Sequence, residues 1–340
     1  MQDANISLQG RMAMRDVQSN ETTGSEPLVR PGMAAIATAV AAGTASLWVN
    51  HRARKAERLH PPVGRSMQVD GGALHYAEMG DGPPVLLLHG NGVRLEDFIA
   101  CGLFDALARR HRVIAIDRPG FGHSERPRGR LWTPLAQAAL FRRLLERIGV
   151  ERPVIVGHSW GTLVAVEMGL CAPTDVSGLV LVSGYYYPTA RADVWLNLPG
   201  ATPLIGDVLD HTVLPLAWRL TLNRAVRLMF APAPVPDNFF EVVSREMILR
   251  PRQIRAASED AVYLVPAARR LQKRYADLTM PVTLVAGEGD MIVDPSRQSA
   301  RLHREIRQSE LILTPGVGHM VHHGGTTSLV NAVASMIRGA

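Results

Sequence analysis

The chain has 340 residues, which is long enough for one large α/β domain or for a core with an inserted subdomain. Its composition, 46% hydrophobic and 20% charged, is that of an ordinary globular protein, and no repeat of solenoid period is visible. The net charge of +6 comes almost entirely from arginine, and no basic stripe is interleaved with aromatic residues, so we expect no nucleic-acid partner.

Two cysteines are too few for a disulfide framework. Cys101 and Cys171 lack the spacing of a metal site, and each lies in an apolar stretch of helical pattern. We therefore expect both to be buried, inert thiols.

The start of the chain divides into two segments. Residues 1–32 are polar and lack apolar periodicity, which predicts a disordered leader. Residues 33–50 form an apolar segment, of which residues 33–49 contain no charge, and this length is at the lower bound for a membrane-spanning helix. Trp48 near its end is typical of an interfacial anchor.

Basic residues follow this segment at Arg52, Arg54, Lys55 and Arg58, and basic flanks favour the cytoplasmic side of a membrane. We therefore expect membrane association through a single N-terminal anchor, with the domain that follows it in the cytoplasm. Two alternatives stay open. A cleaved signal would make the protein periplasmic or secreted, and a soluble alanine-rich helix would leave it in the cytoplasm.

From about residue 62, strand-like and helix-like segments alternate. We expect strands at Ala73–Ala77, Pro84–Leu88, Val113–Ile116, Pro153–Val156, Gly178–Val182, Val282–Ala286 and Leu311–Leu313. We expect helices at Phe98–Arg110 and Leu135–Ile148, and a further one after residue 162. Near-continuous apolar strands separated by helices predict an α/β fold with a mostly parallel, doubly wound sheet, formed by residues 62–184 and 280–340. Residues 185–279 are rich in proline and contain helical segments without a convincing strand, which predicts an inserted helical cap.

The stretch VIVGHSWGT, residues 154–162, ends an apolar run on a serine between two glycines and continues with a helical pattern. A nucleophile elbow has this order of strand, serine and helix. It needs small residues two positions to either side of the serine, because the backbone approaches itself closely there, and Gly157 and Gly161 occupy these positions. Ser159 is therefore the candidate nucleophile, provided that an acid and a base follow other strands.

The acid is expected just past the strand at 282–286, where Glu288, Asp290 and Asp294 are available. We favour Asp290, since Asp294 before a proline is typical of a helix N-cap.

The base is expected after the last strand, where His319 follows a glycine-rich loop. His322 and His323 are interpreted as the start of the final helix. A metal site formed by these histidines is not expected, because no acidic residue shares their loop.

The oxyanion hole is predicted from two backbone N–H groups. Asn91 follows the strand that ends at His89–Gly90, and Trp160 follows the serine. Each such donor contributes about 2.7–4 kcal/mol to transition-state stabilisation.

These features together resemble the α/β-hydrolase superfamily, over roughly residues 66–340. The resemblance rests on HGNG at 89–92, DRPGFGHS at 117–124, GHSWG at 157–161, GEGD at 287–290 and the Gly318–His319 pair. It implies a triad in the order Ser159, Asp290, His319, and structural rather than catalytic roles for Asp117, His89 and His158. Dehalogenase and epoxide-hydrolase relatives typically carry aspartate at the nucleophile position, so Ser159 favours acyl transfer.

The function expected is that of a serine hydrolase that cleaves an apolar carboxylic ester or related acyl bond, with no metal or organic cofactor. The resemblance implies that the cap shapes the substrate pocket, and we expect Tyr185 or Tyr186 to line it, with the apolar run 228–230. Three alternatives stay open: a carbon–carbon bond hydrolase, a perhydrolase and a non-catalytic ligand-binding member.

Overall fold

A computed structural model describes residues 31–339, so the leader predicted for residues 1–32 lies almost wholly outside the described residues. The strands are β1 (Arg65–Val69), β2 (Gly72–Met79), β3 (Pro84–Leu88), β4 (Arg112–Ile116), β5 (Val154–His158), β6 (Gly178–Val182), β7 (Val282–Gly287) and β8 (Ser309–Thr314). The helices before β7 are α1 (Pro31–Leu59), α2 (Glu96–Ala100), α3 (Leu103–Ala108), α4 (Pro134–Arg147), α5 (Gly161–Cys171), α6 (Ala192–Ala201), α7 (Ile205–Asp210), α8 (Val213–Phe230), α9 (Phe239–Val242), α10 (Arg245–Ile248) and α11 (Pro251–Leu271). After β7 come α12 (Ser299–Glu305), α13 (Val321–Gly324) and α14 (Thr326–Arg338).

The strands form one sheet in the order β1-β2-β4-β3-β5-β6-β7-β8. The pairs from β4 through β8 are all parallel, and β2 pairs antiparallel with β1 and β4. This confirms the predicted mostly parallel α/β sheet. β1 was not predicted, because its exposed RSMQV sequence has no apolar run.

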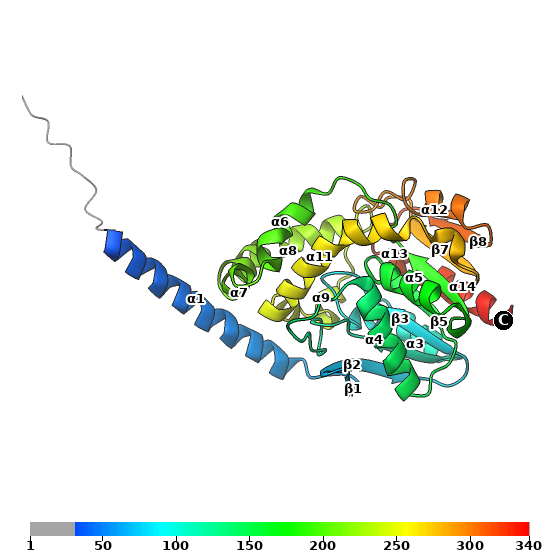
Figure 1. The fold of residues 1–340 in the computed structure, drawn as a ribbon, viewed down its shortest axis with the longest axis horizontal. Helices are drawn as coiled ribbons and strands as arrows, with labels where there is room; N and C mark the ends of the chain where they lie inside the picture. Colours follow the sequence, from blue (N-terminus) through cyan, green and yellow to red (C-terminus); the bar gives the residue numbers. More distant parts are fainter. Residues whose placement is uncertain (1–30, 340) are drawn as a thin grey trace, which may run out of the picture. The chain divides into compact units, whose positions relative to one another are not determined.

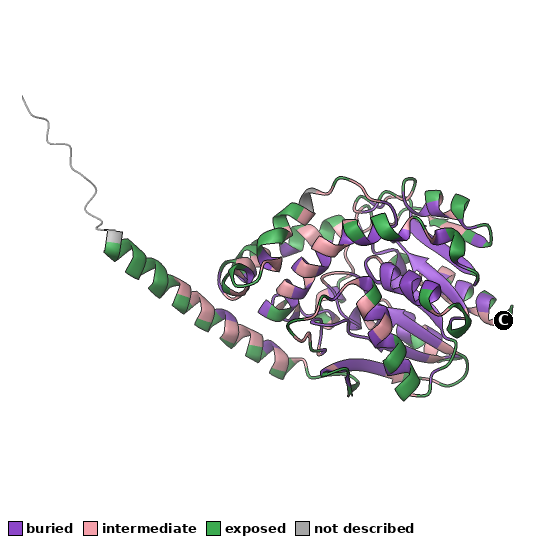
Figure 2. Ribbon diagram, viewed as in Figure 1, coloured by how far each residue is buried: buried purple, intermediate pink, exposed green. Residues whose placement is uncertain are grey.

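Both faces of the sheet are buried, as Figures 1 and 2 show. Successive residues of each strand point to opposite faces, so Leu86 and Leu88 pack on the side of α4 and α5, while Val85 and Leu87 pack on the side of α3 and α14. This two-sided burial explains why the central strands are continuous apolar runs.

Two local predictions were wrong. The helix expected over residues 98–110 is divided into α2 and α3, because Gly102 adopts φ 72°, where a right-handed helix cannot continue. Cys101 is half-buried, and burial raises the pKa of its thiol, but Cys171 is exposed because it ends α5.

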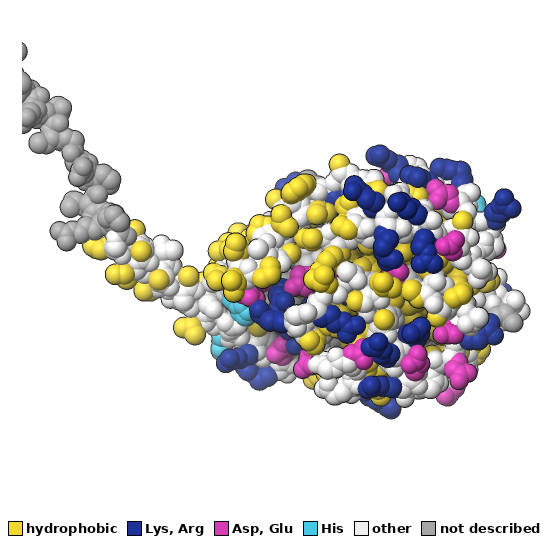
Figure 3. All heavy atoms as spheres, viewed as in Figure 1, with side chains coloured by type: hydrophobic (Ala, Val, Ile, Leu, Met, Phe, Trp, Pro, Cys, Tyr) yellow, Lys and Arg dark blue, Asp and Glu magenta, His cyan; other side chains and the backbone are white. Residues whose placement is uncertain are grey.

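Between β6 and β7 the chain forms only helices and loops, from α6 to α11. Apolar residues of α8, α9 and the following loop make a separate small core that includes Phe230, Phe239 and Val243. Hydrophobic side chains also gather on the outside of α6 and α7 (Figure 3).

The chain divides after Ala41 into two compact units, and α1 contributes to both. Within the larger unit, the second half of α1 packs against helices of the 185–279 segment. Arg52 Nη2 lies 2.7 Å from Glu246 Oε1, and Arg250 Nη1 lies 2.8 Å from Glu57 Oε1. Among the described residues, Gly32–Leu59 is the one helix that is long and apolar enough to cross a membrane.

We predict that the Glu246 ion pairs make the folded state sensitive to acid. Hydrogen bonds from Arg219 and Arg52 lower the pKa of Glu246 from 4.5 to about 2. Because the folded pKa is the lower one, this stabilisation is present above pH 4.5 and is lost as the pH falls toward 2. Glu246→Gln should reduce the free energy of unfolding by about 1 kcal/mol at pH 7, since solvent screens a partly exposed pair, and the difference should vanish near pH 2.

Urea unfolding in mild detergent at several pH values measures this difference. Glu241→Gln, at an exposed glutamate on α9, is the control and should behave as wild type throughout. A loss in the free energy of unfolding of Glu246→Gln that stays the same at every pH would contradict the prediction.

Candidate active site

Ser159 occupies a sharp turn between β5 and α5. Its φ of 51° is unfavourable for a residue with a side chain, and its N–H donates to Val182 O at 2.8 Å. A Cβ added at Gly157 would lie 2.7 Å from Gly161 O, and one at Gly161 would overlap Leu88 O. The two glycines therefore meet the steric requirement that the sequence predicted.

The structure brings Ser159, His319 and Asp290 into one hydrogen-bonded chain. His319 Nε2 lies 2.9 Å from Ser159 Oγ, and His319 Nδ1 lies 2.8 Å from Asp290 Oδ2. The other oxygen of Asp290 accepts the N–H groups of Ile292 and Val293, each at 2.8 Å. With the proton on Nδ1 donated to the carboxylate, Nε2 would be free to accept the hydroxyl proton of the serine.

Neither of the other candidate acids contacts His319. Glu288 is exposed. Asp294 accepts hydrogen bonds from the backbone and hydroxyl of Ser296, and these lower the pKa of its carboxyl. Asp294 was predicted to cap a helix, but it caps a turn instead, because α12 begins only at Ser299.

His322 and His323 lie on the short helix α13, before the final helix, and face Asp97 of α2. Their Nε2 atoms are 2.8 and 2.9 Å from the two oxygens of Asp97. Burial opposes ionisation of Asp97, but the two imidazoles together hold its pKa well below the usual range. The His158 ring lies against this cluster, 4.2 Å from the centre of the His322 ring, and its Nε2 lies 3.1 Å from His319 O.

Asp97 is an acidic residue close to these histidines although it lies in another part of the chain, whereas only acids in the histidines' own loop were expected to matter for a metal site. Ligand atoms of Asp97, His158 and His322 lie within 4.8 Å of one another, as do those of Cys101, His322 and His323. However, both oxygens of Asp97 are engaged by imidazoles at hydrogen-bond distance, so a cation is not needed to explain the cluster.

We predict that Asp97→Asn destabilises the fold by about 3 kcal/mol, because an amide cannot accept from both imidazoles in the buried site. Asp105→Asn, at an exposed aspartate on α3, is the matched control and should change stability by less than about 0.5 kcal/mol. Calorimetric unfolding of the full chain measures both, and equal stability of the two variants would refute the interpretation.

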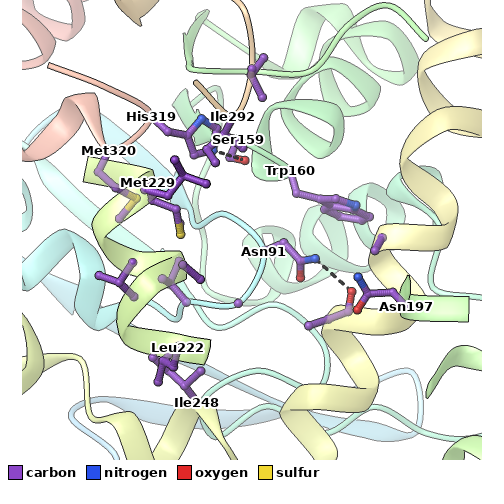
Figure 4. Close-up of a pocket in the computed structure, with 18 of the residues that line it drawn as sticks. Asn91, Ser159, Trp160, Asn197, Leu222, Met229, Ile248, Ile292, His319 and Met320 are labelled. Atoms are coloured by element: carbon purple, nitrogen blue, oxygen red, sulfur yellow. Dashed lines mark hydrogen bonds between the residues drawn. The ribbon is translucent and has the colours of Figure 1, made fainter. Parts of the chain in front are cut away.

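Asn91 and Trp160 lie beside Ser159 on the same cavity (Figure 4). The side-chain amide of Asn91 donates to Ala257 O at 3.0 Å. Among the residues that the structure describes, neither backbone N–H has an acceptor, so both remain available to a bound oxyanion. The Trp160 side chain is buried, donates to Asp260 O at 2.9 Å and packs against the Arg118 guanidinium, 4.4 Å from the ring centre.

Asp117 and His89 stabilise the loops beneath the site. Asp117 is buried and accepts from Leu95 N–H at 2.9 Å and from His123 N–H at 2.9 Å, and it lies 2.7 Å from His75 Nδ1. Burial lowers the pKa of His89 to about 3, and this neutral ring accepts the Arg118 N–H at 2.9 Å. These contacts support the structural roles that the resemblance implied.

Ser159 opens into a cavity of about 590 Å³, within the range of small-molecule sites. Its apolar lining includes Leu222, Val226, Leu228, Met229, Phe230, Phe239, Ile254, Leu264 and Met320.

Tyr185 lines the cavity, whereas Tyr186 does not, which corrects the expectation for Tyr186. Tyr186 is fully buried below the site, where its N–H donates to Gln298 Oε1 and its carbonyl accepts from the Tyr275 hydroxyl.

The doubly wound sheet and the serine at a strand end define a hydrolase of the α/β class. A family model described as the alpha/beta hydrolase family matches residues 85–326. The chain belongs to this family, which confirms the resemblance seen in the sequence.

Its relatives differ in chemistry. Haloalkane dehalogenase 2 of Mycobacterium tuberculosis is 25% identical over 283 residues, covering 81% of this chain and 95% of that protein. The 2-hydroxy-6-oxo-2,4-heptadienoate hydrolase of Pseudomonas putida is 25% identical over 277 residues, covering 79% and 95%. The solved structure of a thermophilic esterase from Thermogutta terrifontis matches with a TM-score of 0.63 at 21% identity, covering 81% and 99%, a likeness that concerns the fold alone.

Proposed function

We propose that the protein hydrolyses an apolar carboxylic ester or a related acyl bond through Ser159, His319 and Asp290. The observation that carries this proposal is the hydrogen-bonded chain from Asp290 Oδ2 through His319 to Ser159 Oγ. A serine hydroxyl becomes a useful nucleophile only when a base removes its proton, and this chain supplies an oriented base.

In the proposed mechanism, His319 Nε2 takes the proton as Ser159 Oγ attacks the substrate carbonyl carbon. The carbonyl oxygen becomes an oxyanion held by the N–H groups of Asn91 and Trp160. Its collapse expels the alcohol, which receives the proton from His319 and leaves an acyl-serine. Water activated by His319 then releases the acid, while Asp290 stabilises the imidazolium in both half-reactions.

Dehalogenation, the activity named for one relative, is disfavoured by the nucleophile. Displacement of a halide from an alkyl carbon by a carboxylate gives an ester, which water can cleave at its carbonyl. The same displacement by Ser159 would give an alkyl ether, which has no carbonyl for water to attack. The serine therefore favours an acyl substrate.

The cavity points to the substrate class. Its wall is mostly aliphatic and aromatic, which suits an acyl or alkyl chain. Arg191 is the one arginine or lysine among the described residues that line it, and its guanidinium donates to Ile292 O at 3.3 Å and lies 5.5 Å from the Tyr185 ring.

Carbon–carbon bond hydrolysis is the second candidate, because one relative is named for the hydrolysis of a dienoate. Such a substrate would place its carboxylate near a cation, and Arg191 lies at the cavity wall. The carbon leaving group would take the place of the alcohol in the mechanism above.

We also propose that residues 62–184 and 280–340 form the catalytic core, that residues 185–279 form a cap over it, and that residues 33–49 anchor the protein in a membrane. The cap is supported by contacts with the loop of His319, since Met320 N–H donates to Met229 O at 3.2 Å. The anchor is supported by the apolar composition of α1 and its basic flank.

We predict that a fluorophosphonate probe labels Ser159 in the folded protein, because the probe reacts with an activated serine. Ser159→Ala should abolish labelling and reduce ester turnover by about 10³-fold or more. Peptide mapping after labelling measures the first result. Absence of labelling in folded wild-type protein would refute the proposed triad.

Ester hydrolysis and carbon–carbon hydrolysis predict different substrate profiles. On the favoured reading, p-nitrophenyl esters of graded chain length are cleaved well, with kcat/KM highest for medium or long acyl chains that fill the apolar cavity. Good turnover of a vinylogous diketone carboxylate with poor turnover of every ester would establish the second candidate instead. Arg191→Gln separates them further, since it should raise KM only for the carboxylate substrate.

A further inference from the structure

The outer surface of α6, α7 and α8 is strongly apolar. We call it the cap face and define it by nine side chains that are 38–86% exposed: Trp195, Leu196, Leu198, Leu204, Ile205, Val208, Val213, Leu216 and Leu220. Figure 3 shows hydrophobic side chains gathered over this region. Contiguous exposed apolar patches of this kind mark interaction surfaces, whereas isolated apolar side chains need no explanation.

The loop between α6 and α7 adds an exposed leucine, Leu204, to the cap face. Leu204 has a φ of 67°, which a residue with a side chain adopts only at an energetic cost. Its backbone carbonyl accepts the Val208 N–H at 3.2 Å, but its side chain is 79% exposed and contributes little packing within the described residues. The loop thus presents a leucine side chain outward within the cap face.

Contacts of α1 indicate what covers it. The apolar residues 33–49 run directly into a segment that is fixed to the helices carrying the cap face. Asn50 Oδ1 lies 3.0 Å from His211 Nδ1, at the end of α7, and Arg52 and Arg219 of α8 share the carboxylate of Glu246. Asn50 and Arg52 directly follow the apolar residues. With residues 33–49 inserted in a bilayer, the ends of α7 and α8 that contact Asn50 and Arg52 would therefore lie close to the bilayer surface.

The helices that meet at this junction also carry exposed basic side chains. These are Arg54 and Lys55 on α1 and, further along α8, Arg224 and Arg227. Basic residues beside an apolar surface suit anionic lipid headgroups, while the apolar residues enter the interface below them.

We propose that the cap face docks on the surface of a lipid bilayer, as a second membrane contact beside the apolar segment of α1. The helices that carry the cap face on their outer side also line the cavity on their inner side, through Asn197 of α6 and Leu222 of α8. Docking would thus bring the cavity close to apolar substrates dissolved in the bilayer, a consequence that rests on the proposed acyl hydrolysis.

Trp195, 75% exposed at the cap face, is a natural reporter of docking. The full chain is reconstituted in phosphatidylcholine–phosphatidylglycerol vesicles with brominated acyl chains, and the Trp195 contribution is obtained as the fluorescence difference from Trp195→Phe. We expect bromination to remove about half or more of that contribution, since the side chain would lie in the interface. The proposal would be overturned if the Trp195 fluorescence has the emission wavelength of a tryptophan in water and is not quenched by the brominated lipid. It would also be overturned if the Trp195 fluorescence is blue-shifted, is not quenched by the brominated lipid and depends on protein concentration, because that would indicate a second copy of the protein on this face.

The double variant Leu204→Asp/Leu220→Asp should reduce bromine quenching of Trp195 at least about twofold, because charges oppose insertion. Leu135→Asp, at an exposed leucine of α4 outside the cap face, is the control for adding a charge at an exposed leucine and should leave quenching unchanged. Equal quenching in both would contradict the proposal.

Two further readouts keep the proposals separate. Carbonate extraction of the same vesicles tests the anchor, and hydrolysis of a water-soluble ester tests the enzyme. Neither depends on the cap face, so the double variant should retain wild-type values in both.

Discussion

The close approach of α5 to the ends of β3 and β5 is the constraint on which the site depends. Gly161 lies against the carbonyl of Leu88, and Gly157 lies against Gly161, so the turn closes only with glycine at both positions. This packing holds Ser159 at a positive φ that an isolated chain would avoid. In this turn the Ser159 hydroxyl lies 2.9 Å from His319 Nε2, and Trp160 lies at the start of α5.

The loop of His319 is supported from two sides. Asp290 holds the imidazole ring directly, and the buried cluster of Asp97 with His322 and His323 fixes the helix that follows. Because buried charged hydrogen bonds are costly to break, the cluster limits how far His319 can move relative to Ser159. The 185–279 segment contacts the same loop through the hydrogen bond from Met320 N–H to Met229 O, so a residue of the cavity wall is bonded to the loop that carries the proposed base.

The mostly parallel sheet could be predicted because its strands are apolar runs separated by helical segments. Parallel strands place their carboxyl ends at one edge of the sheet, so the sequence also shows which polar residues can meet there, and the candidate triad was proposed on this basis. Asp97 could not be found in this way, since its partners are 225 and 226 residues distant and its own helix is short. Tyr186 was misplaced because three consecutive tyrosines look equivalent in sequence, while their different backbone contacts decide which one reaches the cavity. The outward face of α6–α8 was also hidden, since leucine-rich helices are typical of a core.

The central claim is that Ser159 carries the acyl group during turnover. Rapid quenching of the full chain with a p-nitrophenyl ester, followed by intact mass and peptide mapping, tests it most directly. We expect a transient gain of one acyl mass on the peptide that contains Ser159, with a matching burst of p-nitrophenol, and no such gain in Ser159→Ala. Steady turnover with the acyl group on another residue, or with Ser159→Ala as active as wild type, would contradict the account.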